Sequence, residues 1–419
     1  MPESTISAGD TAWVLAAAAL VLIMTPGVAF FYGGMVRRKN AAATVMHSFM
    51  IIGIVSVVWV LWGYSLAFGP TLGGLVGGLN WTGLRDVTTE PVSFYGGGAI
   101  PHQAFMVFQL MFAIITPALI TGAFAERMKF NAFVIFIVLW ITIVYAPLAH
   151  WVWSIGADGE ASGWMGKLGV LDFAGGTVVH ISSGVAALAA AWVVFGRRLR
   201  FQQEPMEPHN VPMVVLGAAL LWFGWFGFNA GSALAAGESA ASAFVVTNTA
   251  AAAALVAWVT MSWIFGKKPS IIGAASGAVA GLVAITPASG FVGPMPAVLI
   301  GIGAGVFCYL AVQQLQRLQV DDSLAVWGVH GIGGTWGALA TGLFFTMGVT
   351  GAVYTSDVSV LTQFGRQVIG VLAAWGWAFG ATLVILLALK YTIGVRVSEE
   401  EEEMGLDLSQ HGEPAYRFE

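Results

Sequence analysis

The chain has 419 residues, of which 58% are hydrophobic and 9% are charged, and its net charge at pH 7 is −5. A soluble domain carries about 25% charged residues, so this composition excludes a protein whose whole surface faces water. Long apolar runs also exclude a transmembrane β-barrel, whose strands alternate apolar and polar residues. The composition therefore predicts an all-α membrane protein with many spanning helices.

Eleven apolar segments are predicted to span the membrane. The 54 glycines of the chain suit helices that pack closely through small residues. Because eleven is an odd number, the two ends of the chain are expected on opposite sides of the membrane. The predicted spans cover residues 11–34, 43–68, 100–123, 131–152, 174–196, 211–232, 240–264, 270–291, 295–316, 325–347 and 366–394.

The Lys and Arg residues are distributed unevenly between the two sides of these spans. Of the 17 in the chain, three lie in loops on one side, namely Arg85, Lys167 and Arg366, and the others lie on the opposite side. Cytoplasmic loops of membrane proteins carry the excess of Lys and Arg. The N-terminus is therefore predicted outside and the C-terminus in the cytoplasm of a multi-pass protein of the cell membrane.

One pattern occurs twice, at residues 172–180 (DFAGGTVVH) and 322–330 (DSLAVWGVH). Each places an aspartate eight residues before a histidine, and a glycine follows each histidine by four residues. On one helix, Asp172 and His180 would lie about 12 Å apart. His180 falls in the fifth predicted span and His330 in the tenth, which predicts inverted five-helix repeats, helices 1–5 and 6–10, with an extra eleventh helix.

The two histidines are candidates for a functional site inside the membrane. An ionisable residue at this depth is costly and usually functional, although a histidine can also serve helix packing alone. A neutral imidazole has one donor and one acceptor nitrogen. If His180 and His330 share one hydrogen bond, a donor and an acceptor remain to face a pore. Such a pore suits a small uncharged molecule that forms hydrogen bonds.

Aromatic residues gather near the outer ends of three predicted spans. Phe108 and Phe112 are four residues apart and share a helix face. Trp153 and Phe228 lie near the outer ends of the fourth and sixth spans, and Ser232 follows Phe228. Each residue alone is more typical of packing or of a membrane interface. Together, aromatic faces and a hydroxyl oxygen would suit a small cation such as ammonium.

These motifs resemble those of the ammonium transporter family, the Amt proteins related to the Rh proteins. The resemblance covers essentially the whole chain, and the motifs follow one another in the family's order. They are residues 31–37 (FYGGMVR), 108–112 (FQLMF), 125–127 (AER), 172–180, 225–232 (WFGFNAGS), 329–331 (VHG) and 405–413 (GLDLSQHGE).

The resemblance implies a homotrimer with one conduction path in each subunit, and it implies transport of ammonium or ammonia with no enzymatic activity. It implies no metal, no cofactor and no nucleic-acid partner. The residue roles that it implies are ammonium recruitment by Trp153, Phe112, Ser232 and Phe228, a stacked gate of Phe108 and Phe112, a pore pair of His180 and His330, and support of the site by Asp172, Tyr32 and Trp225.

The chain divides into a transmembrane domain, residues 1–394, and a cytoplasmic tail, residues 395–419. An acidic run opens the tail, and composition alone would favour a solvated segment. The resemblance implies instead that the tail packs on the cytoplasmic face and takes part in regulation by a PII-type signal protein. The chain departs from the family at Ala325 and Trp327, where relatives often carry Asp and Phe, and this affects the inner part of the path.

The cost of moving an intact cation through a bilayer centre, about 2.5–17 kcal/mol, favours a path for the neutral molecule. Desolvation favours the neutral form of an amine. Ammonium is therefore expected to lose its proton near the phenylalanine gate and to pass His180 and His330 as ammonia, with the proton following. Three alternatives remain open: a passive ammonia channel, an ammonium sensor that transports weakly, and a redox protein whose histidines bind haem.

Overall fold

The computed structural model describes residues 6–92, 95–199, 201, 207–348 and 358–417, and this part of the chain is almost entirely helical. Nine of its helices are long and apolar enough to cross a membrane. They are Ala8–Met35, Arg38–Phe68, His102–Ala123, Phe130–Trp153, Gly176–Phe195, Val211–Gly231, Glu238–Gly266, Pro294–Arg317 and Val360–Thr392.

Several of these helices consist of consecutive α, π and 3-10 segments. The α-helices are α1 (Ala8–Met35), α2 (Ala41–Val58), α3 (Tyr64–Phe68), α4 (His102–Ile120), α5 (Phe130–Trp140), α6 (Ala146–Trp153), α7 (Trp164–Leu168), α8 (Ser182–Leu188), α9 (Val211–Gly231), α10 (Glu238–Gly266), α11 (Ile271–Ile285), α12 (Pro294–Arg317), α13 (Ile332–Phe344), α14 (Val360–Thr392), α15 (Glu399–Met404) and α16 (Leu406–His411). The π segments are η2 (Trp59–Gly63), η6 (Ile141–Tyr145), η7 (Gly176–Ile181), η8 (Ala189–Phe195) and η9 (Trp327–Gly331). The remaining elements are the 3-10 turns η1 (Arg38–Asn40), η3 (Thr82–Leu84), η4 (Gly96–Gly98) and η5 (Thr121–Ala123) and an antiparallel pair of short strands, β1 (Thr71–Leu72) and β2 (Val76–Gly77).

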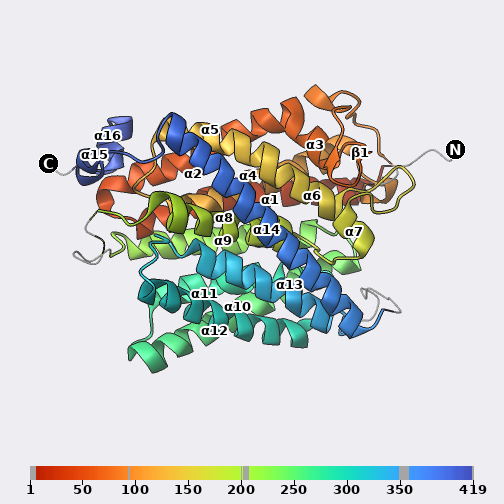
Figure 1. The fold of residues 1–419 in the computed structure, drawn as a ribbon. Helices are drawn as coiled ribbons and strands as arrows, with labels where there is room; N and C mark the ends of the chain where they lie inside the picture. The colour runs from red at the N-terminus through yellow and green to blue at the C-terminus, as the bar shows by residue number, and fades with distance from the viewer. Residues whose placement is uncertain (1–5, 93–94, 200, 202–206, 349–357, 418–419) are drawn as a thin grey trace.

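The helices agree with most of the predicted spans to within a few residues. The two largest differences are at the eighth span, where α11 has only 15 residues, and at the last, where α14 begins at Val360 and not at residue 366. The tenth predicted span corresponds to η9 and α13, residues 327–344. The exact number of membrane crossings stays a prediction, as does the side on which each end lies. The chain ends lie at opposite ends of the helix bundle (Figure 1).

Local sequence signals explain where several long helices begin. The side chains of Ser7, Asn210 and Ser359 each accept a backbone N–H from the first turn of α1, α9 and α14. Such side chains replace a missing helix hydrogen bond at an N-terminus. Pro212 and Pro294 occupy first-turn positions of α9 and α12, where the absent proline N–H costs nothing.

Two helices cross at the centre of the bundle, η7–α8 and η9–α13, and α14 runs obliquely across the bundle (Figure 1). Glycines permit the close crossing. A Cβ atom at Gly184 would lie 2.1 Å from the backbone nitrogen of Gly331, and one at Gly334 would lie 3.0 Å from the Cβ of His180. These two glycines are the ones that follow each histidine by four residues. Their small size therefore lets the two histidine-bearing helices approach.

Candidate functional site

The helix that carries His180 begins at Gly176, so Asp172 is not on that helix. The prediction of both residues on one helix, about 12 Å apart, was therefore wrong. Gly175 has φ +119°, which ends any helical path between the two residues. Glycine adopts this conformation at little steric cost. Asp172 precedes the helix and turns its carboxylate back onto the first helical residues.

The Asp172 carboxylate is fully used as a cap for this helix. Its Oδ1 accepts the backbone N–H groups of Gly175 and Gly176, at 2.8 and 2.6 Å. Its Oδ2 accepts the N–H groups of Thr177 and Val178, at 2.8 and 3.3 Å, and the Thr177 hydroxyl. The first N–H groups of a helix have no partner within the helix, and a negative charge there is favourable. Asp172 therefore fixes the start of the helix that carries His180.

Asp322 occupies the corresponding position before the helix that carries His330. Its Oδ2 accepts the backbone N–H of Trp327, the first residue of η9, at 2.7 Å. Ala325 lies between them in a left-handed conformation, with φ +58°. The repeated sequence pattern thus describes one local structure, an aspartate that caps the π-helical start of a histidine-bearing helix. π-Helical segments occur frequently at functional sites.

His180 and His330 meet at the crossing of their helices, where their side chains are buried. Their Nδ1 atoms are 3.3 Å apart, within hydrogen-bond distance. Their rings lie nearly parallel, at 25° and with centroids 5.4 Å apart. The Nε2 atom of His180 is buried and has no partner among the described residues. The pair therefore shares one hydrogen bond and leaves a ring nitrogen available for another molecule.

A series of aromatic rings leads from His180 toward the outer aromatic residues. Trp225 stacks on His180 with centroids 5.2 Å apart, and its Nε1 donates a hydrogen bond to Thr286. Phe228 lies 5.9 Å from the His180 ring centroid and stacks on Phe112 at 4.2 Å. Trp225 and Phe228 are one helical turn apart on α9, so this helix supplies one wall of the series.

The expectation that Phe108 and Phe112 stack was wrong. Their centroids are 4.9 Å apart, but their planes are inclined at 65°, so one ring presents its edge to the other. The stacked partner of Phe112 is Phe228, at an interplanar angle of 27°. Both inclined and offset arrangements are favourable for aromatic pairs. Phe112 is thus held between two phenylalanines and lines a cavity at the predicted outer end of the bundle, called the outer cavity below.

This outer cavity has a volume of about 160 Å³ and brings together Trp153, Phe112 and Ser232. Trp153 meets Phe112 edge to face at 5.9 Å and donates its Nε1–H to the carbonyl of Asp172 at 2.9 Å. The Ser232 hydroxyl donates to the carbonyl of Phe228, at 2.9 Å, which leaves the lone pairs of its oxygen to accept. The cavity can therefore offer aromatic faces and an acceptor oxygen to a small cation.

Sequence reasoning did not assign several other lining residues to this site, among them Tyr95, Phe105 and Gln109. The ring of Tyr95 stacks on Phe105 at 4.1 Å. Gln109 is buried, and its Oε1 has no partner among the described residues. Phe105 and Gln109 could have been found, since they share α4 with Phe108 and Phe112. Tyr95 lies in a glycine-rich loop without a sequence signal for its position.

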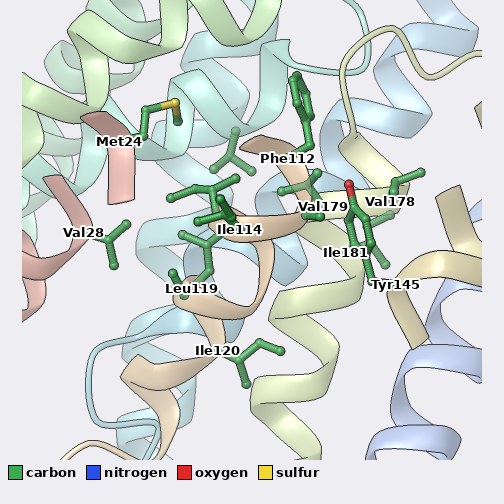
Figure 2. Close-up of a cluster of buried hydrophobic side chains, with 14 of the residues drawn as sticks. Met24, Val28, Phe112, Ile114, Leu119, Ile120, Tyr145, Val178, Val179 and Ile181 are labelled. Carbon is green, nitrogen blue, oxygen red and sulfur yellow. The ribbon is translucent and has the colours of Figure 1, made fainter. Parts of the chain in front are cut away.

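Apolar side chains surround the path between its two ends. Figure 2 shows a buried cluster that includes Phe112 of α4 together with Val178, Val179 and Ile181 of η7. Tyr32 contacts the C-terminal part of α4, where its hydroxyl donates a hydrogen bond to the carbonyl of Leu119 at 3.0 Å. This packing excludes water from the surroundings of the histidine pair.

The opposite end of the bundle carries a network of buried ion pairs that joins four loops. Glu126 pairs with Arg37 at 2.6 Å and contacts Arg198 at 3.7 Å. Asp321 pairs with Arg198 at 2.9 Å and with the fully buried Arg127 at 3.4 Å. Burial alone would raise the pKa of Asp321, but these two guanidinium groups outweigh it and hold the pKa low. The network fixes the loop that continues into Asp322.

The tail docks on this same end of the bundle, where α15 and α16 lie (Figure 1). Glu402 is buried, accepts the backbone N–H of Leu199 at 2.5 Å and pairs with Arg396 at 2.8 Å. Asp407 is also buried and accepts the N–H groups of Ala42 and Ala43 at the start of α2. The tail is thus packed through buried residues between Val395 and Asp407, while residues 412–417 are exposed.

Replacement of Asp407 by alanine is expected to loosen the tail. Removing a capping side chain from a helix costs about 0.5–2 kcal/mol, and here the cap belongs to the contact between α16 and α2. Residues 399–411 should exchange backbone hydrogens roughly 2–30-fold faster, which hydrogen exchange by mass spectrometry measures. The Glu399→Ala variant, whose side chain is exposed at the start of α15, is the control. Equal exchange in wild type and Asp407→Ala would contradict the role of this cap.

Comparisons with known proteins agree with one another. The model of the Ammonium Transporter Family matches residues 12–416. The chain is 50% identical to an ammonium transporter of Bacillus subtilis, over 98% of both chains. It is 48% identical to the ammonium transporter Amt1 of Archaeoglobus fulgidus, over 98% of this chain and 100% of the relative. A solved sensor Amt protein superposes with a TM-score of 0.87 at 32% identity, over 96% of this chain and 98% of that one.

Proposed function

This chain belongs to the ammonium transporter family, and on that basis we propose that it recruits ammonium at the outer cavity, removes its proton and conducts ammonia past the histidine pair while the proton follows. The family makes it a multi-pass protein of the cell membrane that transports ammonium or ammonia and is not an enzyme. The observation that carries the proposal is the hydrogen-bonded contact of His180 and His330, 3.3 Å apart, in an apolar surround.

The outer cavity supports the recruitment step. Cation–π attraction contributes about 0.5–2 kcal/mol per ring, with the larger value when the cation is desolvated. Trp153 and Phe112 present two rings, and Ser232 presents an oxygen that can accept an ammonium N–H. A cavity of about 160 Å³ admits a compact cation and few waters. These features favour ammonium over larger amines.

The inner wall of the cavity supports loss of the proton. Beyond Phe112 the surroundings are apolar and buried, so the charged form of the substrate loses hydration. Neutral ammonia keeps a lone pair and three N–H groups, which match the donor and acceptor capacity of neutral imidazoles. The hydrogen bond between His180 and His330 gives the proton a route that does not require an intact cation. An ammonium pulse on proteoliposomes tests this step, because it should produce an inward current.

Replacement of Trp153 by leucine is expected to weaken recruitment. The loss of one cation–π contact, about 0.5–2 kcal/mol, should raise the half-saturating ammonium concentration roughly 2–30-fold. The maximal current should change much less, because the histidine pair is intact. The current measured as a function of ammonium concentration separates the two quantities.

The matched control for this prediction is Trp164→Leu. Trp164 lies on α7 and packs on Trp151 at 5.6 Å, and it does not line the outer cavity. The Trp164→Leu variant should leave the half-saturating ammonium concentration unchanged. An unchanged value for Trp153→Leu as well would remove Trp153 from the recruitment site.

The assembly and the regulation are also proposals. Family resemblance supports a homotrimer. The docked tail supports regulation by a PII-type signal protein on the cytoplasmic face, since Glu402 and Asp407 connect the tail to the loops around the ion-pair network. Native mass spectrometry of the purified protein, with and without such a regulator, tests both statements.

One rival function has a specific observation in its favour. The solved sensor Amt protein shares this fold at a TM-score of 0.87, so the architecture can accompany sensing. A sensor that transports weakly would bind ammonium, and binding would raise the melting temperature, but proteoliposomes would show almost no uptake. Uptake that saturates with ammonium concentration would exclude a sensor that transports weakly. The same measurement of current separates our proposal from a passive ammonia channel, which moves no charge.

The haem alternative finds no support in the geometry. The Nδ1 atoms of His180 and His330 engage each other, so an iron ligated by these nitrogens would have to displace that hydrogen bond. A visible spectrum of the purified protein tests the point directly.

A further inference from the structure

The two capping aspartates differ in how many hydrogen bonds their carboxylates accept. Each carboxylate oxygen of Asp172 accepts two backbone N–H groups. The Oδ2 atom of Asp322 accepts the backbone N–H of Trp327, while its Oδ1 is buried without a donor from any residue that the structure describes. A buried oxygen without a donor is costly. Asp322 therefore has a free oxygen that can take a proton or a ligand, whereas Asp172 has none.

Asp322 also lies at a cavity, which its outer counterpart does not line. The cavity has a volume of about 530 Å³ and lies beside the first turn of the helix that carries His330. Among the described residues that line it, Asp322 is the only carboxylate and Lys268 the only cation. The cavity is at the end of the bundle where the tail docks, opposite the aromatic cavity.

Burial shifts the titration of Asp322 toward neutral pH, and the groups around it modify this shift. Burial raises the pKa of Asp322 to about 6, and the backbone N–H groups of Trp327 and Val326 oppose this increase. Asp321 raises the pKa further and Arg127 lowers it. The phenol of Tyr32 also lies near Asp322, and Lys268 lines the same cavity. Asp322 can therefore gain and lose a proton under physiological conditions.

We propose that Asp322 exchanges the proton with ammonia at the inner end of the path. The inference rests on the proposed function. In the inward direction, the protonated carboxyl gives its proton to the lone pair of ammonia, so an O–H bond breaks and an N–H bond forms. Ammonium leaves through the cavity, and the carboxylate receives the proton that has followed by way of His330. One nitrogen and one positive charge cross in each cycle. In the outward direction the carboxylate accepts the proton of ammonium.

The Asp322→Asn variant tests this assignment. Its amide oxygen can still accept the Trp327 N–H, so the helix cap is kept while the acid is removed. The ammonium-driven current should fall at least about 100-fold, the lower range for removal of a positioned acid–base group. In wild type, the outward current should rise as the inner pH rises through about 6, because the carboxylate is the form that accepts a proton. This rise should be absent from the variant.

Gln316→Ala is the matched control, since Gln316 lines the same cavity on α12 and has no acid. It should keep the current and its pH dependence. Asp322→Glu retains an acid, and it should keep a current whose pH midpoint is displaced. Melting temperatures establish that each variant is folded. If Asp322→Asn does not fold, the displaced midpoint of Asp322→Glu supports the proposal and an unchanged midpoint overturns it.

A folded Asp322→Asn protein with wild-type current and pH dependence would overturn the inference and leave the proposed function intact. A wild-type protein that conducts ammonia without any current would instead overturn both. The two failures are therefore distinguishable in one set of proteoliposomes.

Discussion

The double variant His180→Ala/His330→Ala is expected to lose the ammonium-driven current. The two imidazoles are the polar groups that contact each other at the helix crossing, and methyl groups can neither hold ammonia by hydrogen bonds nor pass a proton. A positioned acid–base group contributes about 100–10,000-fold to a proton transfer. We therefore expect a current at least about 100-fold below wild type, measured on supported membranes after an ammonium pulse.

Several buried histidines allow a matched control for this result. His150 is also buried, but its Nδ1 contacts the carbonyl of Ala67 in α3 at 3.0 Å and its Nε2 contacts the Thr71 hydroxyl in β1 at 2.8 Å. His150→Ala should keep the current per folded protein. A double variant that retains full current would show that the proton does not travel through His180 and His330.

Replacement of Asp172 by alanine is expected to have the largest effect on stability. The substitution leaves backbone N–H groups of residues 175–178 and the Thr177 hydroxyl without their acceptor. One buried donor without an acceptor costs about 1–3 kcal/mol. The free energy of unfolding should fall by roughly 3 kcal/mol or more. Unfolding of the purified protein in detergent measures it.

The Asp172→Asn variant should fall between wild type and Asp172→Ala, because one amide oxygen can accept part of the same set of donors. Asp158→Ala is the control, since Asp158 is exposed in a loop and surface changes usually alter stability by less than about 0.5 kcal/mol. If Asp172→Ala is as stable as wild type and loses only the current, Asp172 carries protons and does not serve mainly as a helix cap.

Much of the helical arrangement could be predicted from the sequence because the apolar runs are long and the charges between them are few. The crossing of the two histidine-bearing helices followed from their placement five spans apart. The lengths of α11 and of the tenth span were less predictable, because turns in an apolar segment leave hydropathy almost unchanged. The sequence also could not show that η7 and η9 are π-helical, since their residues are equally compatible with an α-helix.

The sequence predicted which residues form the site better than it predicted how their side chains are oriented. The sequence identified Phe112, Trp153 and Ser232, which line one cavity, but it could not give ring orientations. The spacing predicted that Phe108 and Phe112 share a helix face, and stacking was implied only by the family resemblance. The inclined pair depends on side-chain rotation and on Phe228 from α9. The roles of these residues in transport stay predictions.

The two aspartates illustrate what a repeated spacing leaves undetermined. A histidine eight positions after an aspartate fits a continuous helix as well as a capped helix start, and only the backbone at Gly175 distinguishes them. The same spacing concealed a difference between the pair. Asp172 is saturated by donors, whereas Asp322 retains an oxygen without a donor at a cavity, because no hydroxyl takes the place of Thr177 in the second copy.

The ratio of charge to nitrogen carried through the wild-type protein tests the central claim most directly. Proteoliposomes that contain the purified protein allow labelled ammonium uptake and current to be measured together at several pH values and membrane potentials. If ammonia and its proton take separate routes through the same subunit, one elementary charge accompanies each nitrogen at every pH where uptake is measurable. Uptake of nitrogen without charge, unaffected by the membrane potential, would contradict the account.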